Sequence, residues 1–154
     1  MRECRQPALA SALALCTLLM IGCGKGGGSI SAAGKETSIK LDILASFYKD
    51  YMDNNRGRPP KDMEAFREYL QTRTELLESY KQRGLIESID QLLVSSRDEE
   101  PFVVLFGKLV EVSEWPGAYY VAYEQTGVDE QRMVARLVGG VDMLDEQQFA
   151  QQFR

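Results

Sequence analysis

Apolar residues recur at three- and four-residue spacing between Ser38 and Asn54, which places them along one face of a helix. These residues are Leu41, Leu44, Phe47, Tyr48, Tyr51 and Met52. We expect Ser38 to cap this helix. The segment Gly57-Arg58-Pro59-Pro60 is expected to end it, because proline lacks the amide donor that a helix requires. A stripe of this composition is typical of a core-facing helix rather than of a ligand site.

The same spacing predicts further helices downstream. Asp62 is expected to cap a second helix that carries its apolar residues inward. A third helix is expected from Thr74 to Arg83, where the following Gly84 is a typical helix end. The stretch from Leu85 to Val94 favours a short additional helix over an ordered connector.

From residue 101 the pattern changes to that of strands. The run from Phe102 to Phe106 is continuously apolar, which is typical of a strand buried on both faces or lying at the centre of a sheet. A second strand is expected from Ala118 to Glu124, with side chains alternating between two faces. One face is expected to carry Tyr119, Val121 and Tyr123, and the other Tyr120 and Ala122.

Two more strands and a last helix complete the pattern. A hairpin over 126–131 is expected to lead into a strand over 132–138. A turn at Gly139-Gly140 then precedes a short strand over 141–144, and Asp145 is expected to cap a terminal helix. Because helices precede strands, the predicted fold class is α+β, with N-terminal amphipathic helices packed on a three- to four-stranded antiparallel sheet.

The chain begins with a segment of a different kind. Residues 8–21 are apolar or small over about fourteen positions, too few to span about 30 Å of hydrocarbon as a stable helix but suited to the core of an export signal. Gly22 then places a small residue directly before Cys23. The glycine-rich run over 24–34 follows, which we interpret as a flexible spacer.

This segment resembles the lipobox of bacterial lipoproteins, in which an aliphatic residue stands three positions before the cysteine, as Met20 does here. The resemblance implies cleavage after Gly22, a diacylglycerol thioether on Cys23 and, usually, an additional N-acyl chain. Two or more acyl chains anchor a protein stably. The alternatives are an ordinary cleaved signal with an incidental cysteine, and a retained transmembrane helix.

The lipobox interpretation divides the chain into a signal peptide over 1–22, a lipidated cysteine with a Gly/Ser-rich tether over 23–37, and a single α+β domain over 38–154. The expected partner of Cys23 is a bacterial lipid bilayer, with the domain exported. An outer membrane facing the periplasm is favoured over an inner membrane. Because the other two cysteines would leave with the leader, the mature chain is expected to form no disulfide.

The globular part carries a second resemblance, in four stretches. They are the helix end at 55–60, the run from Ser96 to Val104, the strand segment from Val121 to Glu124 and the Gly127-Val128-Asp129 hairpin. In these the chain is similar to small secreted and lipidated proteins of Planctomycetes-type bacteria, whose globular part looks like the C-terminal domain of type II secretion pseudopilins. The resemblance implies a pseudopilin-like fold and a surface setting, and no activity. The chain departs from the pilin pattern where Cys23 and the glycine-rich run replace a long hydrophobic helix.

The amino-acid composition excludes several kinds of catalytic and binding site. The chain has no histidine, which excludes histidine-dependent nucleophile activation, proton shuttling and metal binding. Its net charge of −5 argues against nucleic acid as a partner. A calcium-loop pattern at Asp53, Asn55 and Gly57 lacks the later glutamate. We therefore expect no metal site and no cofactor.

Two groups of side chains remain to be considered. Glu124 is expected on the solvent face of its strand, in a cross-strand ion pair with Arg132 or Arg136. Trp115 and the tyrosines of residues 119–123 could form an aromatic surface that binds a peptide or a glycan, although core packing accounts for most of them.

The expected function is that of a membrane-anchored lipoprotein with a non-catalytic interaction or structural domain, facing an unknown envelope protein partner. One alternative is a pseudopilin-like accessory component of a type II secretion-type system. A further alternative is a small carboxylate-dependent hydrolase, which would need two carboxyl groups to meet in one concave site. The carboxylates considered for it are Glu99, Glu124, Asp129 and Asp142.

Overall fold

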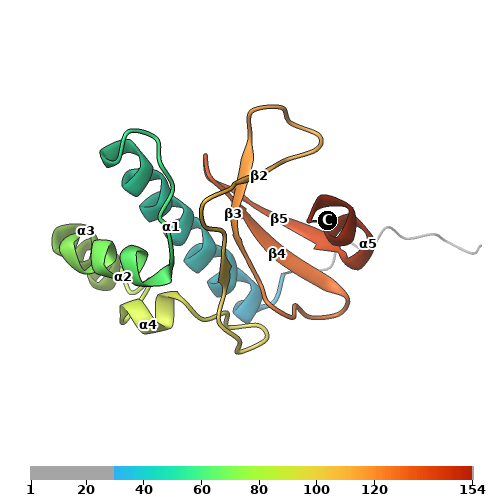
Figure 1. Ribbon diagram of the computed structural model, residues 1–154. Coiled ribbons are helices and arrows are strands. Elements are labelled where there is room, and N and C mark those ends of the chain that lie inside the picture. The colour runs from blue at the N-terminus through green and yellow to red at the C-terminus, as the bar shows by residue number, and fades with distance from the viewer. Residues whose placement is uncertain (1–29, 154) are drawn as a thin grey trace, which may run out of the picture.

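The structure is a computed structural model that describes residues 30–153 (Figure 1). Its helices are α1 (Ala32–Asn54), α2 (Met63–Thr72), α3 (Thr74–Gln82), α4 (Ile89–Leu92) and α5 (Glu146–Gln152). Its strands are β1 (Val103–Val104), β2 (Val110–Glu111), β3 (Tyr119–Tyr123), β4 (Gln131–Arg136) and β5 (Val141–Asp145). The predicted α+β class is confirmed, with five strands in the sheet rather than three or four.

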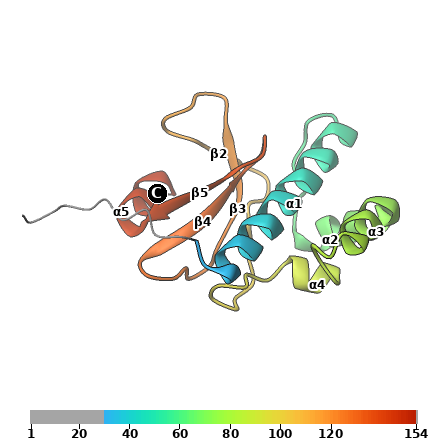
Figure 2. The same ribbon diagram turned by 180° about the vertical axis from the view of Figure 1, so that it is seen from behind.

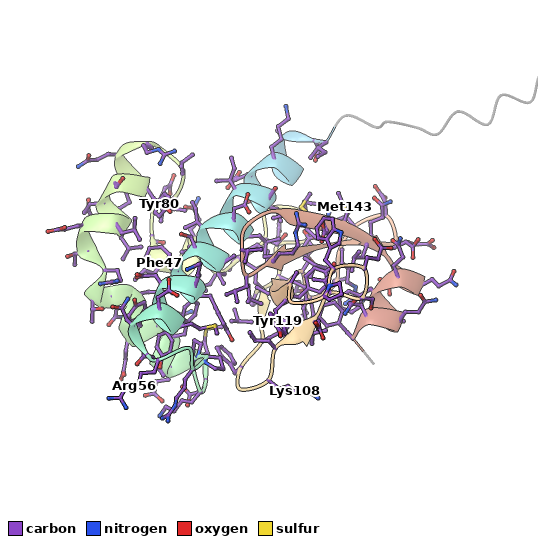
Figure 3. The ribbon with its side chains drawn as sticks, turned by 90° about the horizontal axis from the view of Figure 1, so that it is seen from above. Phe47, Arg56, Tyr80, Lys108, Tyr119 and Met143 are labelled. Carbon is purple, nitrogen blue, oxygen red and sulfur yellow. The ribbon has the colours of Figure 1, made fainter. Side chains whose placement is uncertain are left out.

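The domain is layered, with α1 between the sheet and the smaller helices. Figures 1 and 2 show α1 crossing one face of the sheet, α2 and α3 beyond it, and α5 on the opposite face. Phe47 of α1 points toward Tyr80 of α3 (Figure 3), and their ring centres are 5.9 Å apart. Tyr48 meets Phe66 of α2 at 5.7 Å. Both sides of α1 are therefore covered, and its apolar stripe is core, as the sequence predicts.

Helix α1 begins seven residues earlier than expected. Ser31 is its cap, with the Oγ atom accepting a hydrogen bond from the Gly34 amide at 3.0 Å. Gly34 and Thr37 are buried, and a Cβ atom on Gly34 would lie 3.6 Å from the Met133 side chain. The sheet-facing stripe thus continues upstream through small residues, which the apolar pattern does not reveal. Residues 32–37, expected in the tether, belong to the helix.

The sheet is antiparallel, in the order β1-β3-β4-β5, and β2 also pairs with β3. The sequence pattern predicts that the run over 102–106 forms a strand buried on both faces or lying at the centre of a sheet. Strand β1 has two residues and lies at the edge, so that prediction is wrong in the length and the place of the strand. Phe102 and Val104 are buried in the same cluster as α1. The helix layer accounts for their apolar character, because β1 has a strand neighbour on one side only.

A bulge in β3 alters the predicted alternation. The register with β4 shifts between Tyr120 and Ala122. As a result, Val121 and Ala122 both belong to the core against α1, while Tyr120 and Tyr123 both belong to the core against α5. The prediction that Tyr120 and Tyr123 lie on opposite faces is wrong. The bulge supplies two aromatic rings to the face that α5 covers.

Helix α5 is short and is held by its cap and by aromatic packing. Asp145 caps it as predicted, in a reciprocal capping box with Gln148. Phe149 stacks on Phe153 at 4.5 Å, and Tyr123 lies 5.0 Å from Phe149. These contacts fix α5 against the sheet, where it forms one wall of the groove described next.

Candidate functional site

Glu124 lies at the centre of a buried polar cluster. Its side chain is fully buried, and its carboxylate accepts hydrogen bonds from Ser95 Oγ at 2.9 Å, Arg97 at 2.9 Å and the Met133 amide at 2.8 Å. The expected pairing with Arg132 or Arg136 on a solvent face is wrong. The β3 bulge shifts the alternation, so that Glu124 points to the core rather than away from it.

The cluster extends to α1 through Thr37 and Lys40. The buried Lys40 ammonium donates to the Val94 carbonyl at 3.2 Å and to Ser96 Oγ at 2.7 Å. Thr37 Oγ1 accepts a hydrogen bond from the Ser96 amide at 3.0 Å. These contacts join the loop after α4 to the first half of α1.

Arg97 and Asp98 join the same loop to the β3–β4 hairpin. Arg97 also donates to the Val128 carbonyl at 3.1 Å. Asp98 accepts from the amides of Thr126 and Gly127 at 3.1 and 2.8 Å. Burial raises the pKa of Glu124, against the lowering effect of the Met133 amide, Ser95 and Arg97. Its carboxylate oxygens are all engaged with the protein, so this cluster is a structural clamp.

A groove of about 290 Å³ opens on the other face of the sheet. We call it the α5 groove, and it is lined by the β2–β3 loop, the sheet and α5. Its lining is Val112, Ser113, Glu114, Trp115, Tyr120, Asp142, Met143, Leu144, Gln148, Gln151 and Gln152. Neither Glu124 nor Arg97 belongs to it.

Trp115 lines the α5 groove and is 51% exposed. The Arg136 guanidinium lies 4.5 Å from the centre of its ring. Arg136 Nε in turn lies 3.5 Å from Asp142 Oδ2, and Tyr120 donates its hydroxyl hydrogen to the same oxygen at 3.0 Å. Burial, reinforced by Asp142, raises the pKa of Tyr120, so that Tyr120 remains a neutral hydrogen-bond donor.

The wall of the α5 groove is fastened by Gln152. Its Oε1 atom accepts from the amide and hydroxyl of Ser113 at 3.1 and 2.7 Å, and its Nε2 atom donates to the Glu111 carbonyl. Glu111 also accepts from the Gly117 amide at 2.8 Å. The loop that carries Trp115 is thereby attached to α5 on one side and to β2 on the other.

Two further grooves lie on the helical side of the domain. One, of about 540 Å³, contains Asp50 and Arg73. These side chains form a bidentate ion pair at 2.6 Å, and Tyr69 donates to Asp50 at 2.6 Å. The other, of about 430 Å³, follows the turn after α1 and includes Arg56. Asp50 and Arg73 satisfy one another in the first of these. The α5 groove is the better candidate because its lining includes Trp115, a large aromatic residue that is 51% exposed.

The structure places the predicted candidates in different environments. Gly22 and Cys23 lie outside the described residues. Trp115 is exposed beside a groove, whereas Tyr120 is buried and Tyr123 half-buried in the α5 core. The three glutamines that α5 contributes are absent from the candidates drawn from the sequence, because nothing in their spacing shows that this helix folds back over the sheet.

The four carboxylates considered for a hydrolase do not share one groove. Glu99 and Asp129 are exposed, at turn positions with positive φ of 59° and 55°. Glu124 is buried in the clamp, and Asp142 lines the α5 groove. The second carboxylate in that groove is Glu114, which is not among these four.

The comparisons with known proteins add no relative. No protein-family model matches the chain, and no curated protein or solved structure matches it either. None of the helices within residues 30–153 combines the length and the apolar character that a bilayer-spanning segment needs. In the same residues, no group of three or more acidic or cysteine side chains is placed to hold a metal ion. The two resemblances drawn from the sequence therefore stay predictions.

Proposed function

We propose that this protein is a bacterial lipoprotein in which acylated Cys23 holds an exported, non-catalytic binding domain at an envelope membrane. The observation that carries the proposal is the sequence from Met20 to Cys23, an apolar leader that ends in a small residue and a cysteine. The acidic chain would be repelled by anionic headgroups, so the acyl chains supply the attachment.

The start of α1 determines how far the domain can stand from the bilayer. Ser31, the cap of α1, lies eight positions after Cys23. At about 3.3–3.6 Å per residue, the intervening chain reaches at most about 30 Å. The domain would therefore work close to the membrane surface, which restricts its partners to molecules of the envelope.

Exchange of Cys23 for serine tests the proposal. In the Cys23→Ser variant we expect the protein to lose its acyl mass and to move from the membrane fraction to the soluble fraction. The Cys16→Ser variant is the matched control, because it removes a thiol within the leader and should leave processing and attachment unchanged. A Cys23→Ser protein that still sediments with membranes, or that is processed at another site, would exclude the lipobox interpretation.

A pseudopilin-like accessory subunit remains the second candidate. It is favoured by the long helix α1 lying across an antiparallel sheet. A subunit that packs helix to helix would need a free apolar helix face, and α1 is covered by the sheet on one side and by α2 and α3 on the other. Crosslinking of the protein to its neighbours in membranes would distinguish the two candidate functions, since a pseudopilus subunit must contact pilin-type helices.

A further inference from the structure

The half-open indole of Trp115 points to a ligand. The Arg136 guanidinium lies over one face of the ring at 4.5 Å, and the residue as a whole remains 51% exposed. The backbone that carries the ring is held in a turn, in which the Trp115 amide donates to the Val112 carbonyl at 3.1 Å and the Ala118 amide donates to the Trp115 carbonyl at 3.0 Å. An aromatic face beside a concave surface is suited to stacking a flat ligand.

The polar groups around this ring are suited to hydroxyl groups. Gln151 offers a donor and an acceptor, and Gln148 offers its side-chain NH2 group while its Oε1 atom accepts from the Asp145 amide. The Ser113 hydroxyl donates to Gln152 and can still accept a hydrogen bond. Asp142 accepts from Tyr120 at 3.0 Å and lies 3.5 Å from Arg136, and a carboxylate has about four lone-pair positions in total. Asp142 can therefore accept another hydrogen bond from a ligand without losing those it has.

The charge of the α5 groove argues against an anionic ligand. Its lining includes the carboxylates of Glu114 and Asp142 and no basic side chain, and the nearby Arg136 is balanced by Asp142. A phosphate or carboxylate group would meet net negative charge here. What matches the groove is a neutral molecule with an apolar face and a rim of hydroxyl groups.

We propose that the α5 groove binds a neutral saccharide. One sugar ring would stack on the face of Trp115 opposite Arg136, and its hydroxyl groups would form hydrogen bonds with Asp142 and with the side-chain amides of Gln148 and Gln151. This inference rests on the proposed function, because it names the ligand class of the binding domain. The volume of about 290 Å³ is at the small end of the roughly 300–1,000 Å³ of ligand pockets. The groove therefore takes a short segment of a glycan.

The chain itself provides the probe, because Trp115 is its only tryptophan. The full chain with Cys23→Ser, which removes the lipid, is titrated with chitotetraose, cellotetraose and maltotetraose while the tryptophan emission is followed. We expect a saturable change in emission with at least one of the three. Gln151→Ala should weaken that binding by about tenfold, the effect of losing about 1.4 kcal/mol. The Val138→Ala variant is the control, since Val138 is 70% exposed and outside the groove.

Calorimetry with Trp115→Ala completes the test, because that variant has no tryptophan to observe. Binding should fall by at least about tenfold, since the variant loses an aromatic contact together with its buried area. Near-ultraviolet circular dichroism of Gln151→Ala, whose side chain lies at the surface, shows that the fold is kept.

Three results would overturn the inference: no saturable response to any of the three sugars at millimolar concentration, equal affinity in Trp115→Ala, or binding of oligolysine in place of the sugars. The last would assign the groove to a basic peptide. None of these results bears on membrane fractionation of the wild type. Failure of the saccharide inference is thus distinguishable from failure of the lipid attachment.

Discussion

At the scale of single residues, the position of Arg136 beside Trp115 depends on a glycine. A Cβ atom on Gly140 would overlap the Arg136 guanidinium, and Gly140 has a positive φ of 88°. Its neighbour Gly139 has a similar φ of 90° with no atom near its Cβ position. Both glycines therefore require a positive φ, and they differ in that only a Cβ atom on Gly140 would meet a neighbouring side chain.

This pair gives a matched test of the Trp115 environment. We expect Gly139→Ala to lower the free energy of unfolding by about 1–2 kcal/mol, the cost of a left-handed backbone in an L-residue. Gly140→Ala should lower it further and also shift the emission of Trp115, because Arg136 must move. Urea unfolding and emission spectra of both variants measure this, and identical spectra would show that Gly140 does not set the Arg136 position.

The buried pair of Arg97 and Glu124 should be much stronger than the surface pair of Arg132 and Glu146. In Glu124→Gln, the Arg97 side chain, 9% exposed, loses its counter-charge, and we expect a loss of about 3–5 kcal/mol. Glu146 is 51% exposed, and Glu146→Gln should cost less than about 1 kcal/mol. Chemical denaturation compares the two, and equal losses would contradict the view of the Glu124 cluster as a clamp.

Residue identity alone could not show the environment of Glu124. Strict alternation along β3 places Glu124 on the same face as Tyr120, and the bulge between Tyr120 and Ala122 reverses that assignment. A bulge depends on pairing with β4, which is a tertiary property. The exposed position of Trp115 next to the Pro116-Gly117 turn is by contrast the kind of feature that a turn sequence does indicate.

At the scale of elements, caps were the most reliable signal. The sequence assigns Asp62 and Asp145 as caps, and their side chains accept from the amides of Ala65 and Gln148. The cap of α1 is Ser31 rather than Ser38, because both serines satisfy the same local rule and the buried small residues between them show no apolar pattern.

Serine exchange at these two positions tests the start of α1. Ser31→Ala should lower the free energy of unfolding by about 1 kcal/mol, since it removes the side-chain acceptor of the Gly34 amide. Ser38→Ala should leave stability unchanged or raise it slightly, because Ser38 is inside the helix, where alanine is the better helix former. The reverse ranking in thermal or urea unfolding would place the start of the helix at Ser38.

The short strands were the least predictable elements. β1 and β2 have two residues each and pair with the same edge of β3. The apolar run over 102–106 resembles a long strand because the helix layer buries it, and β2 lies in a stretch with no distinct pattern. Two-residue strands are stabilised by their neighbours rather than by their own sequence.

At the scale of the whole molecule, the clamp and the ion pairs make stability depend on pH. Burial opposes ionisation of Asp98, but the amides of Gly127, Glu100 and Thr126 outweigh it and lower its pKa. Asp50 likewise has a lowered pKa, since Tyr69 and Arg73 outweigh its burial. As the pH falls, the unfolded chain therefore binds these protons before the folded domain does. The contribution of Asp98 and Asp50 to stability is fully present above about pH 4 and is lost as the pH falls below that value.

The raised pKa of Glu124 affects the pH dependence of stability in the opposite direction, because the folded domain takes up that proton first.

We expect Asp98→Asn to lower the free energy of unfolding by about 1–2 kcal/mol at pH 7, because its hydrogen bonds to the hairpin are weaker. The same variant should lose less stability than the wild type between pH 7 and pH 3. Urea unfolding at both pH values measures this, and an unchanged pH dependence would show that Asp98 is not a source of acid sensitivity.

The central claim, attachment through Cys23, is tested most directly by the intact mass of the mature protein purified from membranes. We expect a chain that begins at Cys23 and carries the added mass of a diacylglycerol thioether, with or without a further acyl chain. An unprocessed chain of 17.3 kDa, or a mature chain that begins elsewhere without acyl mass, would contradict the account.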